Sequence, residues 1–484
     1  MNAPTEHAVT PASAATVSIG GGAAGRGDVP AAVAALRERL GERCSTSESV
    51  REQHGRGESW HPVQAPDAVC FARSTEEVAA IVRVCAARRV PIVPYGAGSS
   101  LEGHLQALRG GVSIDLSGMD RILEVNAEDM DCRVEAGVTR KALNARLRDT
   151  GLFFPIDPGA DASIGGMTAT RASGTNAVRY GTMRENVMSL TYVDARGEIV
   201  HTGTRARKSS AGYDLTRLLV GSEGTLGVIT EVGLGLHGLP EAVLAAVVDF
   251  PSVDAAVRTV IETIQLGIPM ARIELVDVGH LRAINAYCGT DHPERDTLFL
   301  EFHGSAASVT EQVAQFAEIA SEHGAGELRQ ARHEEERTAL WQARHDAYYA
   351  VLAANPGKRG MTTDVCVPIS ELAGIIDWVR RTLSGGPFSP DVLGHVGDGN
   401  FHMVFCVTPG DELELAEALR CNALLIERAL ALGGTCTGEH GVGFGKLKYL
   451  EREHGEAAMA TMRAIKHALD PDDLMNPGKT VAIA

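Results

Sequence analysis

The chain has 484 residues, and 45 lysines and arginines against 62 aspartates and glutamates give it a formal net charge of −17. This length is too great for one hydrophobic core, so two or three domains are expected. The chain is acidic overall and has no cluster of basic residues, which argues against nucleic acid or an anionic membrane as the main partner. No apolar run approaches about 18 residues, so no membrane span is expected, although peripheral contact stays open.

The N-terminal residues 1–30 are rich in Ala, Gly, Ser, Thr and Pro and are expected to form a disordered tail. They lack the basic start and apolar centre of a secretory signal. The nine cysteines are scattered, with no Cys-x-x-Cys pair, which indicates reduced thiols. A cytoplasmic protein is expected, with contact at the inner face of a membrane left open.

Residues 31–240 alternate between helical and extended patterns. Helical periodicity covers Thr75–Arg89, and short β-like runs follow at Val112–Leu116, Ile122–Val125 and Arg133–Glu135. A further helix is expected at Thr139–Arg148. The alternation predicts a first domain of mixed helices and strands.

Three glycine-rich loops lie within this first domain, at residues 94–100, 158–181 and 221–229. Such loops expose backbone N–H groups, which can hold a pyrophosphate without basic side chains. No Gly-x-Gly-x-x-Gly follows a first strand and no P-loop pattern is present, so a Rossmann nicotinamide site is unsupported. Glu223 within the third loop is either a turn-forming carboxylate, a ligand of ribose or a group that orients the loop.

The pattern changes after Pro240, where we place a second domain over residues 241–430. Strand-like Val243–Phe250, helix-like Val253–Leu266 and strand-like Arg272–Val276 come first. Strand-like Thr297–His303 and helix-like Val309–His323 complete two strand–helix–strand units. This order predicts an antiparallel sheet of ferredoxin-like layout. One helix over residues 333–354 should follow, and residues 431–484 are expected to return to the first domain.

Candidate metal ligands and proton acceptors are concentrated in Gly394–His402 and in Gly438–Gly441, about forty residues later. His395 and His402 are seven residues apart, which puts them on opposite faces of a regular strand. They can share one ion only if residues 397–399 form a turn, which Gly-Asp-Gly favours. Glu439 would be the third ligand of a divalent ion, for which histidine and carboxylate suit zinc, manganese or iron, with zinc or manganese preferred; the neighbouring His440 is a candidate general base.

These motifs together resemble the FAD-binding oxidoreductases of the vanillyl-alcohol oxidase type. Within that family the nearest likeness is to the branch of D-lactate dehydrogenase (cytochrome) and the glycolate oxidase D subunit, with D-2-hydroxyglutarate dehydrogenase as a neighbour. The resemblance implies an α+β fold: a two-part FAD-binding domain interrupted by an inserted, antiparallel-sheet, ferredoxin-like cap domain. It runs from about Val50 to the C-terminus.

The resemblance implies one FAD, bound without a covalent link. Its expected contacts are Pro94, Tyr95, Gly96, Ala97, Gly98, Ser99, Ser100, Pro158, Gly159, Ser163, Ile164, Gly165, Gly166, Ser173, Gly174, Glu223, Gly224, Ile229 and Asn476. It also implies a metal held by His395, His402 and Glu439. Arg344 would grip the substrate carboxylate, because a planar guanidinium matches it with two hydrogen bonds. Only the resemblance favours Arg344 over Arg337.

The resemblance implies oxidation of a D-2-hydroxyacid, with D-lactate as the first candidate substrate. The electrons would pass to a quinone, a cytochrome or an electron-transfer flavoprotein. Thr362 and Val404 stand where hydroxyglutarate-oxidising relatives place a lysine and an asparagine, which favours a short or apolar side chain on the substrate. The alternatives are glycolate or D-2-hydroxyglutarate oxidation, the FAD subunit of a glycolate oxidase complex, and a non-redox use of flavin. A homodimer stays open.

Overall fold

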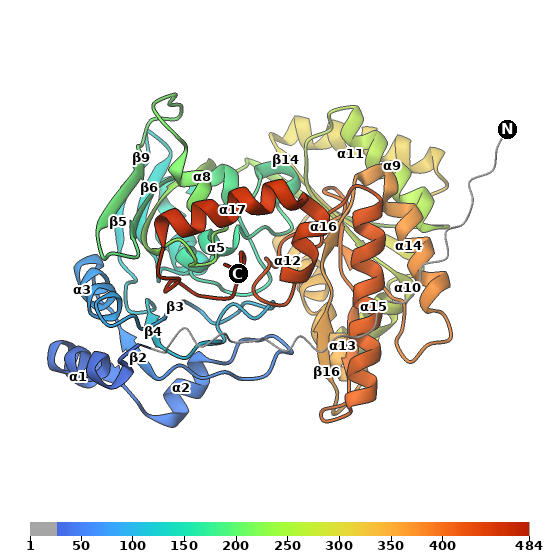
Figure 1. The fold of residues 1–484 in the computed structure, drawn as a ribbon. Helices are drawn as coiled ribbons and strands as arrows, with labels where there is room; N and C mark the ends of the chain where they lie inside the picture. Colours follow the sequence, from blue (N-terminus) through green and yellow to red (C-terminus); the bar gives the residue numbers. More distant parts are fainter. Residues whose placement is uncertain (1–26, 484) are drawn as a thin grey trace.

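The computed structural model describes residues 27–483. The predicted tail of residues 1–30 lies outside this range except for its last four residues, of which Val29 and Pro30 open α1 (Val29–Leu40). Figure 1 shows two bodies side by side, one blue to green and one yellow to orange. Within residues 27–483, no helix combines the length and apolar character needed to cross a bilayer.

A small, mostly parallel sheet opens the first body. Its strands are β1 (Cys44–Ser45), β2 (Ala68–Phe71), β3 (Ile92–Tyr95) and β4 (Val112–Asp115). Their order is β1-β2-β4-β3, with β2, β4 and β3 parallel. Apolar side chains of α1 and α3 (Thr75–Ala86) pack on this sheet and form its core. The end of β3 therefore delivers residues 96–100 to the edge of the sheet, where ligands bind in such folds.

An antiparallel sheet completes the first body. Its strands are β5 (Ile122–Asn126), β6 (Asp131–Glu135), β8 (Val187–Val193), β9 (Ile199–Gly203) and β10 (Val228–Gly235), in the order β5-β6-β10-β8-β9. The connecting helices are α4 (Arg140–Leu147), α5 (Ile164–Thr170), α6 (Ala177–Tyr180), α7 (Met183–Asn186) and α8 (Leu215–Leu219), and a small ribbon pairs β7 (Leu152–Phe153) with β11 (His237–Gly238). Alternating apolar residues of β6, β8 and β10 bury their side chains in one core with α4 and α5.

The second body contains the predicted ferredoxin-like sheet. Strands β12 (Ala242–Phe250), β13 (Met270–Val276), β14 (Asp296–Gly304) and β15 (Arg329–Ala331) lie in the order β15-β12-β14-β13, and β18 (Leu393–Gly394) extends the edge at β13. All five strands are antiparallel to their neighbours. Helices α9 (Val253–Gln265), α11 (Ala306–Glu322) and α14 (Ile369–Leu383) bury apolar faces in the same core.

Two helices differ from the sequence prediction. A helix that we did not predict, α10 (Val278–Cys288), lies between β13 and β14, and the Asp277 side chain caps it by accepting from the His280 N–H. The helix predicted over residues 333–354 is two helices, α12 (Glu334–His345) and α13 (Ala347–Ala354). Asp346 interrupts it with φ −76° and ψ −2°, away from regular helical geometry.

The rest of the chain first packs on the second body and then returns to the first. Strand β16 (Arg359–Thr362) pairs with β20 (Val404–Val407), and β17 (Val365–Cys366) pairs with β19 (Asn400–Phe401). Helices α15 (Glu412–Ala431), α16 (Leu450–His454) and α17 (Glu456–Leu469) follow, and α17, red in Figure 1, lies against the first body. The chain then bonds to β3, with Ile92 N–H donating to Leu474 and Asn476 N–H donating to Ile92. The domain limits at residues 240 and 430 stay a prediction.

Candidate active site

One cavity of about 640 Å³ joins the two bodies. The first body lines it with residues 94–101, 157–163, 172–175 and 223–224, and the second with side chains of α12, α13 and β20. The first glycine-rich loop and the histidine motif, which are about 300 residues apart in the sequence, therefore face the same space, together with the other two loops.

The part of the cavity that the first body lines is a backbone cradle. The N–H groups of residues 96–100 donate to no backbone acceptor within residues 27–483. Gly98 has φ +78°, a conformation that favours glycine, and a Cβ at Gly96 would displace the Ser163 hydroxyl. Five free donors without a basic side chain fit the pyrophosphate of the expected FAD.

Every predicted FAD contact except Ile164 lines this cavity. The Ile164 side chain is fully buried in the core beneath the cavity. Its neighbours Gly165 and Gly166 do line the cavity, at the start of α5.

Glu223 lines the cavity, but its carboxylate is occupied by other protein groups. It accepts from Val442 N–H at 2.7 Å, Gly443 N–H at 2.8 Å and the Thr480 hydroxyl at 2.6 Å. Burial alone would raise the pKa of Glu223, but His104 and these donors lower it to about 2. These contacts favour a role in orienting the 441–443 loop over a role as a ribose ligand.

A tight turn brings His395 and His402 to the same place. Asp398 N–H and Asn400 N–H both donate to the His395 carbonyl, and Leu393 and His402 exchange two backbone hydrogen bonds. Gly399 has φ +79°, and a Cβ there would overlap the Val367 carbonyl. The turn that the odd spacing of the two histidines demands is therefore present.

The loop that carries Glu439 and His440 is held by one buried carboxylate. Asp364 Oδ2 accepts from the N–H groups of both residues, at 3.1 and 2.9 Å, and from the Thr437 hydroxyl at 2.8 Å. Asp364 Oδ1 accepts from Asn400 Nδ2 at 2.8 Å. Asp364 thus joins the loop to the turn between the two histidines.

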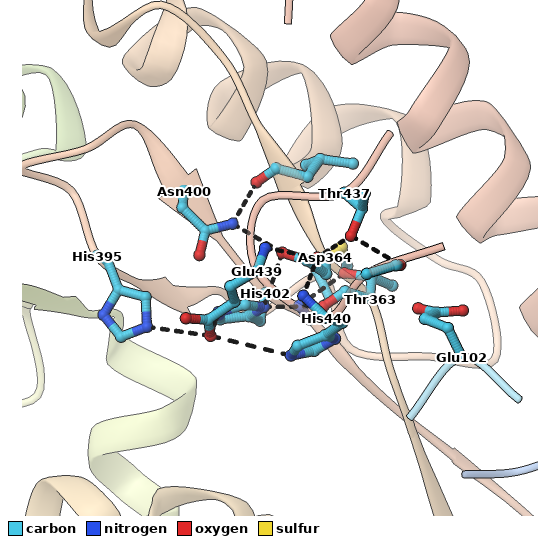
Figure 2. Close-up of polar contacts among 12 residues, drawn as sticks. Glu102, Thr363, Asp364, His395, Asn400, His402, Thr437, Glu439 and His440 are labelled. Carbon is cyan, nitrogen blue, oxygen red and sulfur yellow. Dashed lines mark hydrogen bonds and ion pairs between the residues drawn. The ribbon is translucent and has the colours of Figure 1, made fainter. Parts of the chain in front are cut away.

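His395, His402 and Glu439 converge on one point. Glu439 Oε1 is 3.3 Å from the Nε2 atoms of both histidines. Figure 2 shows how these three side chains are arranged. The opposite nitrogens are already engaged: His395 Nδ1 with Glu274 at 2.6 Å and His402 Nδ1 with the Thr363 carbonyl at 2.9 Å. This pattern directs both Nε2 atoms at one shared position, as at protein metal sites.

The charges at this point suit a cation. Burial alone would raise the pKa of Glu439, but His395 and His402 hold it well below its ordinary value. Burial would lower the pKa of His395, but Glu274 and Glu439 hold it well above the ordinary value. A carboxylate between two imidazoles beside an open cavity fits a divalent ion with free coordination positions.

His440 lies beside this cluster and is not one of its three converging side chains. Its Nε2 is 3.9 Å from Glu439 Oε1, and its buried Nδ1 has no hydrogen-bond partner within the described chain. Burial lowers its pKa to about 4, so the imidazole is neutral near pH 7. A neutral ring at the cavity wall can accept a proton.

Arg344 on α12 lines the cavity and is 7 % exposed. Its Nη2 donates to Glu274 Oε2 at 2.6 Å, while its buried Nε has no partner in the described part of the chain. Arg337, the other arginine weighed on this helix, bonds instead to the Arg332 carbonyl at an exposed position. The geometry favours Arg344 as a carboxylate-binding group.

Sequence reasoning missed two of the supporting carboxylates, Glu274 and Asp364. Glu274 gave a signal, because it is a charged residue inside the apolar strand run Arg272–Val276. Asp364 gave a weaker signal, because the sequence Thr-Thr-Asp is equally typical of a turn.

Comparison with known proteins places this site in a family. Residues 66–203 match the FAD binding domain family, and residues 239–480 match the family of FAD linked oxidases, C-terminal domain. The solved structure of p-cresol methylhydroxylase superposes with a TM-score of 0.76 at 18 % identity, over 93 % of this chain and 96 % of that one. This likeness confirms the predicted vanillyl-alcohol oxidase-type fold.

Relatives with assigned names are similar along most of the chain. A zebrafish (Danio rerio) protein named probable D-lactate dehydrogenase, mitochondrial, is 50 % identical over 91 % of this chain and 90 % of its own. An Arabidopsis thaliana protein named D-lactate dehydrogenase [cytochrome], mitochondrial, is 48 % identical over 93 % and 80 %. The glycolate oxidase subunit GlcD of Bacillus subtilis is 36 % identical over 86 % and 89 %.

Proposed function

We propose that this chain, which belongs to the FAD-linked oxidase family, oxidises D-2-hydroxyacids. Its preferred substrate is D-lactate, which it converts to pyruvate. The observation that carries the proposal is the joint lining of one cavity by the glycine cradle, by Arg344 and by the cluster of His395, His402 and Glu439. Relatives named D-lactate dehydrogenase at 48 and 50 % identity support the substrate.

Each group has a distinct task in this proposal. Bound FAD supplies the acceptor for the hydride of the substrate carbon, and a zinc or manganese ion held by His395, His402 and Glu439 supplies Lewis acidity. Arg344 binds the substrate carboxylate through its free donors. His440, neutral because it is buried, accepts the hydroxyl proton.

The cavity wall near the cluster favours a small substrate side chain. Thr362 and Val404 face each other across the β16–β20 pair, and both line the cavity with Leu393. None of the three carries a positive charge that could neutralise a second carboxylate, and burying that charge without an ionic partner is costly. A methyl group, as in lactate, meets no such penalty.

The glycolate oxidase subunit at 36 % identity supports glycolate as the alternative substrate. We propose that the enzyme would use a cytochrome as its electron acceptor, in keeping with the name of the Arabidopsis relative, with a quinone or an electron-transfer flavoprotein as alternatives. A cytoplasmic location stays a prediction, since two of these relatives are named as mitochondrial.

A panel of substrates with an artificial electron acceptor tests this proposal. D-lactate should give a kcat/KM at least about tenfold above D-2-hydroxyglutarate and D-malate, because Thr362, Val404 and Leu393 offer no positive charge to a second carboxylate. A reversed preference would overturn D-lactate as the substrate, and a higher kcat/KM for glycolate would favour the alternative.

A further inference from the structure

A fully buried carboxylate lies on a strand of the second body, next to the cavity residues Arg344 and His395. Glu274 is on β13, between β14 and β18, and its exposed fraction is 0 %. Its strand neighbours Ile273 and Leu275 belong to the apolar core. A buried charge destabilises a fold unless it is paired and hydrogen-bonded, so its contacts identify its role.

Both oxygens of Glu274 bond to side chains of the candidate active site. Oε2 accepts from Arg344 Nη2 at 2.6 Å, and Oε1 is 2.6 Å from His395 Nδ1. Both contacts have the short length of charge-assisted hydrogen bonds. One strand residue thus connects α12, which carries Arg344, with the turn after β18, which carries His395.

The two contacts act on the free ends of their partners. With an ion bound at Nε2 of His395, the remaining ring proton would lie on Nδ1, which is 2.6 Å from Glu274, while Nε2 faces Glu439. The bond to Nη2 fixes one arm of the Arg344 fork and leaves its Nε without a partner. The position of the proposed ion and the position of the carboxylate clamp are therefore set by the same group.

We propose that Glu274 is a positioning residue that fixes the metal ligand His395 and the substrate clamp Arg344 relative to each other. This inference rests on the proposed function for the role of Arg344. It assigns Glu274 a function in both ion binding and substrate binding, although Glu274 touches neither ligand. A 2-hydroxyacid presents its hydroxyl and carboxylate on adjacent carbons, so the spacing between ion and guanidinium must be held closely.

The test compares Glu274→Gln with a matched control, Asp296→Asn. Asp296 is a buried carboxylate at the start of β14 in the same sheet, and it pairs with Arg380 at 2.6 Å. Both substitutions remove an ion pair between a buried carboxylate and an arginine, but Arg380 is partly exposed and only the first substitution touches the site. Four quantities are measured: the affinity of substrate-free protein for Zn²⁺ or Mn²⁺ by competition with a chelator, FAD content, and the KM and kcat for D-lactate at saturating metal.

For Glu274→Gln we expect metal affinity to fall about 10- to 100-fold and KM to rise at least about tenfold, with FAD content unchanged. Asp296→Asn should leave metal affinity, FAD content and KM within about twofold of wild type, since it lies outside the site. If Glu274→Gln fails to bind FAD, the test uses Glu274→Asp instead. This variant keeps the negative charge, but its shorter side chain reaches less far toward His395 and Arg344.

Unchanged metal affinity in the Glu274 variant would overturn the proposal. So would a lowered metal affinity with an unchanged KM at saturating metal, because Glu274 would then serve His395 alone. The metal measurement needs no substrate, so it stands even if wild-type protein oxidises no 2-hydroxyacid. That last result would overturn the proposed function instead.

Discussion

The imidazole rings of His402 and His440 are stacked, with 5.0 Å between their centroids and 10° between their planes. His402 directs Nε2 at Glu439, while His440 keeps a greater distance from the same oxygen. A proposed ligand and a proposed proton acceptor are thus held side by side in one rigid pair. The roles of the two histidines differ, and substitution can separate them.

Replacing His402 by Ala should abolish turnover and leave FAD bound. Removal of one of three proposed ligands costs the ion and its Lewis acidity, so kcat should fall by about a thousandfold or more. Metal content and flavin absorbance are measured with kcat. His323→Ala is the control, because His323 pairs with Glu262 at the end of α11, away from the cavity. Retained turnover in His402→Ala would remove His402 from the ligand set.

Replacing Arg344 by Lys should raise the KM for D-lactate by about tenfold or more. An ammonium cannot reproduce the planar fork that binds a carboxylate with two hydrogen bonds. Arg337→Lys on the same helix is the matched control, since Arg337 bonds only to a backbone carbonyl at an exposed position. A KM that responds equally to both substitutions would show that Arg344 does not bind the substrate.

The pH dependence should identify His440. A general base must be unprotonated, and burial lowers the pKa of His440 to about 4. At saturating metal, kcat/KM should therefore persist as the pH falls below 6.5 and decline only as it approaches 4. In His440→Asn, kcat should fall by about 10²- to 10⁴-fold. A decline centred at 6.5 or above in wild type, absent from the variant, would contradict a buried neutral base.

A single charge near the substrate side chain should change specificity. Thr362→Lys would place a positive charge where a second carboxylate could pair with it, so kcat/KM for D-2-hydroxyglutarate relative to D-lactate should rise about tenfold. Thr362→Met adds similar length without charge and is the control. If both variants change the ratio alike, size and not charge sets the preference.

Patterns local in sequence predicted much of the fold. The alternation after residue 240 predicts the ferredoxin-like sheet, because two strand–helix–strand units have few ways to bury their apolar faces. The odd spacing of His395 and His402 predicts the turn at Gly397–Gly399, since no regular strand could bring both to one point. Asp346 gave no such signal, and the break it makes between α12 and α13 was missed.

Contacts between distant residues could not be predicted in the same way. Glu274 bonds to His395 across 121 residues, and Asp364 bonds to the Glu439 N–H across 75. No spacing rule reaches so far, because the pairing depends on how the sheet and the loops pack. The sequence therefore predicts the residues that face the cavity better than the carboxylates that hold them.

An anaerobic titration of the FAD-bound protein tests the central claim most directly. D-lactate and L-lactate are each added while the oxidised flavin absorbance is followed, before and after the metal is removed with a chelator and then restored. The proposed function predicts stoichiometric bleaching by D-lactate alone, loss of the bleaching after chelation and recovery with Zn²⁺ or Mn²⁺. Equal bleaching by D-lactate before and after complete metal removal would contradict the proposed ion held by His395, His402 and Glu439.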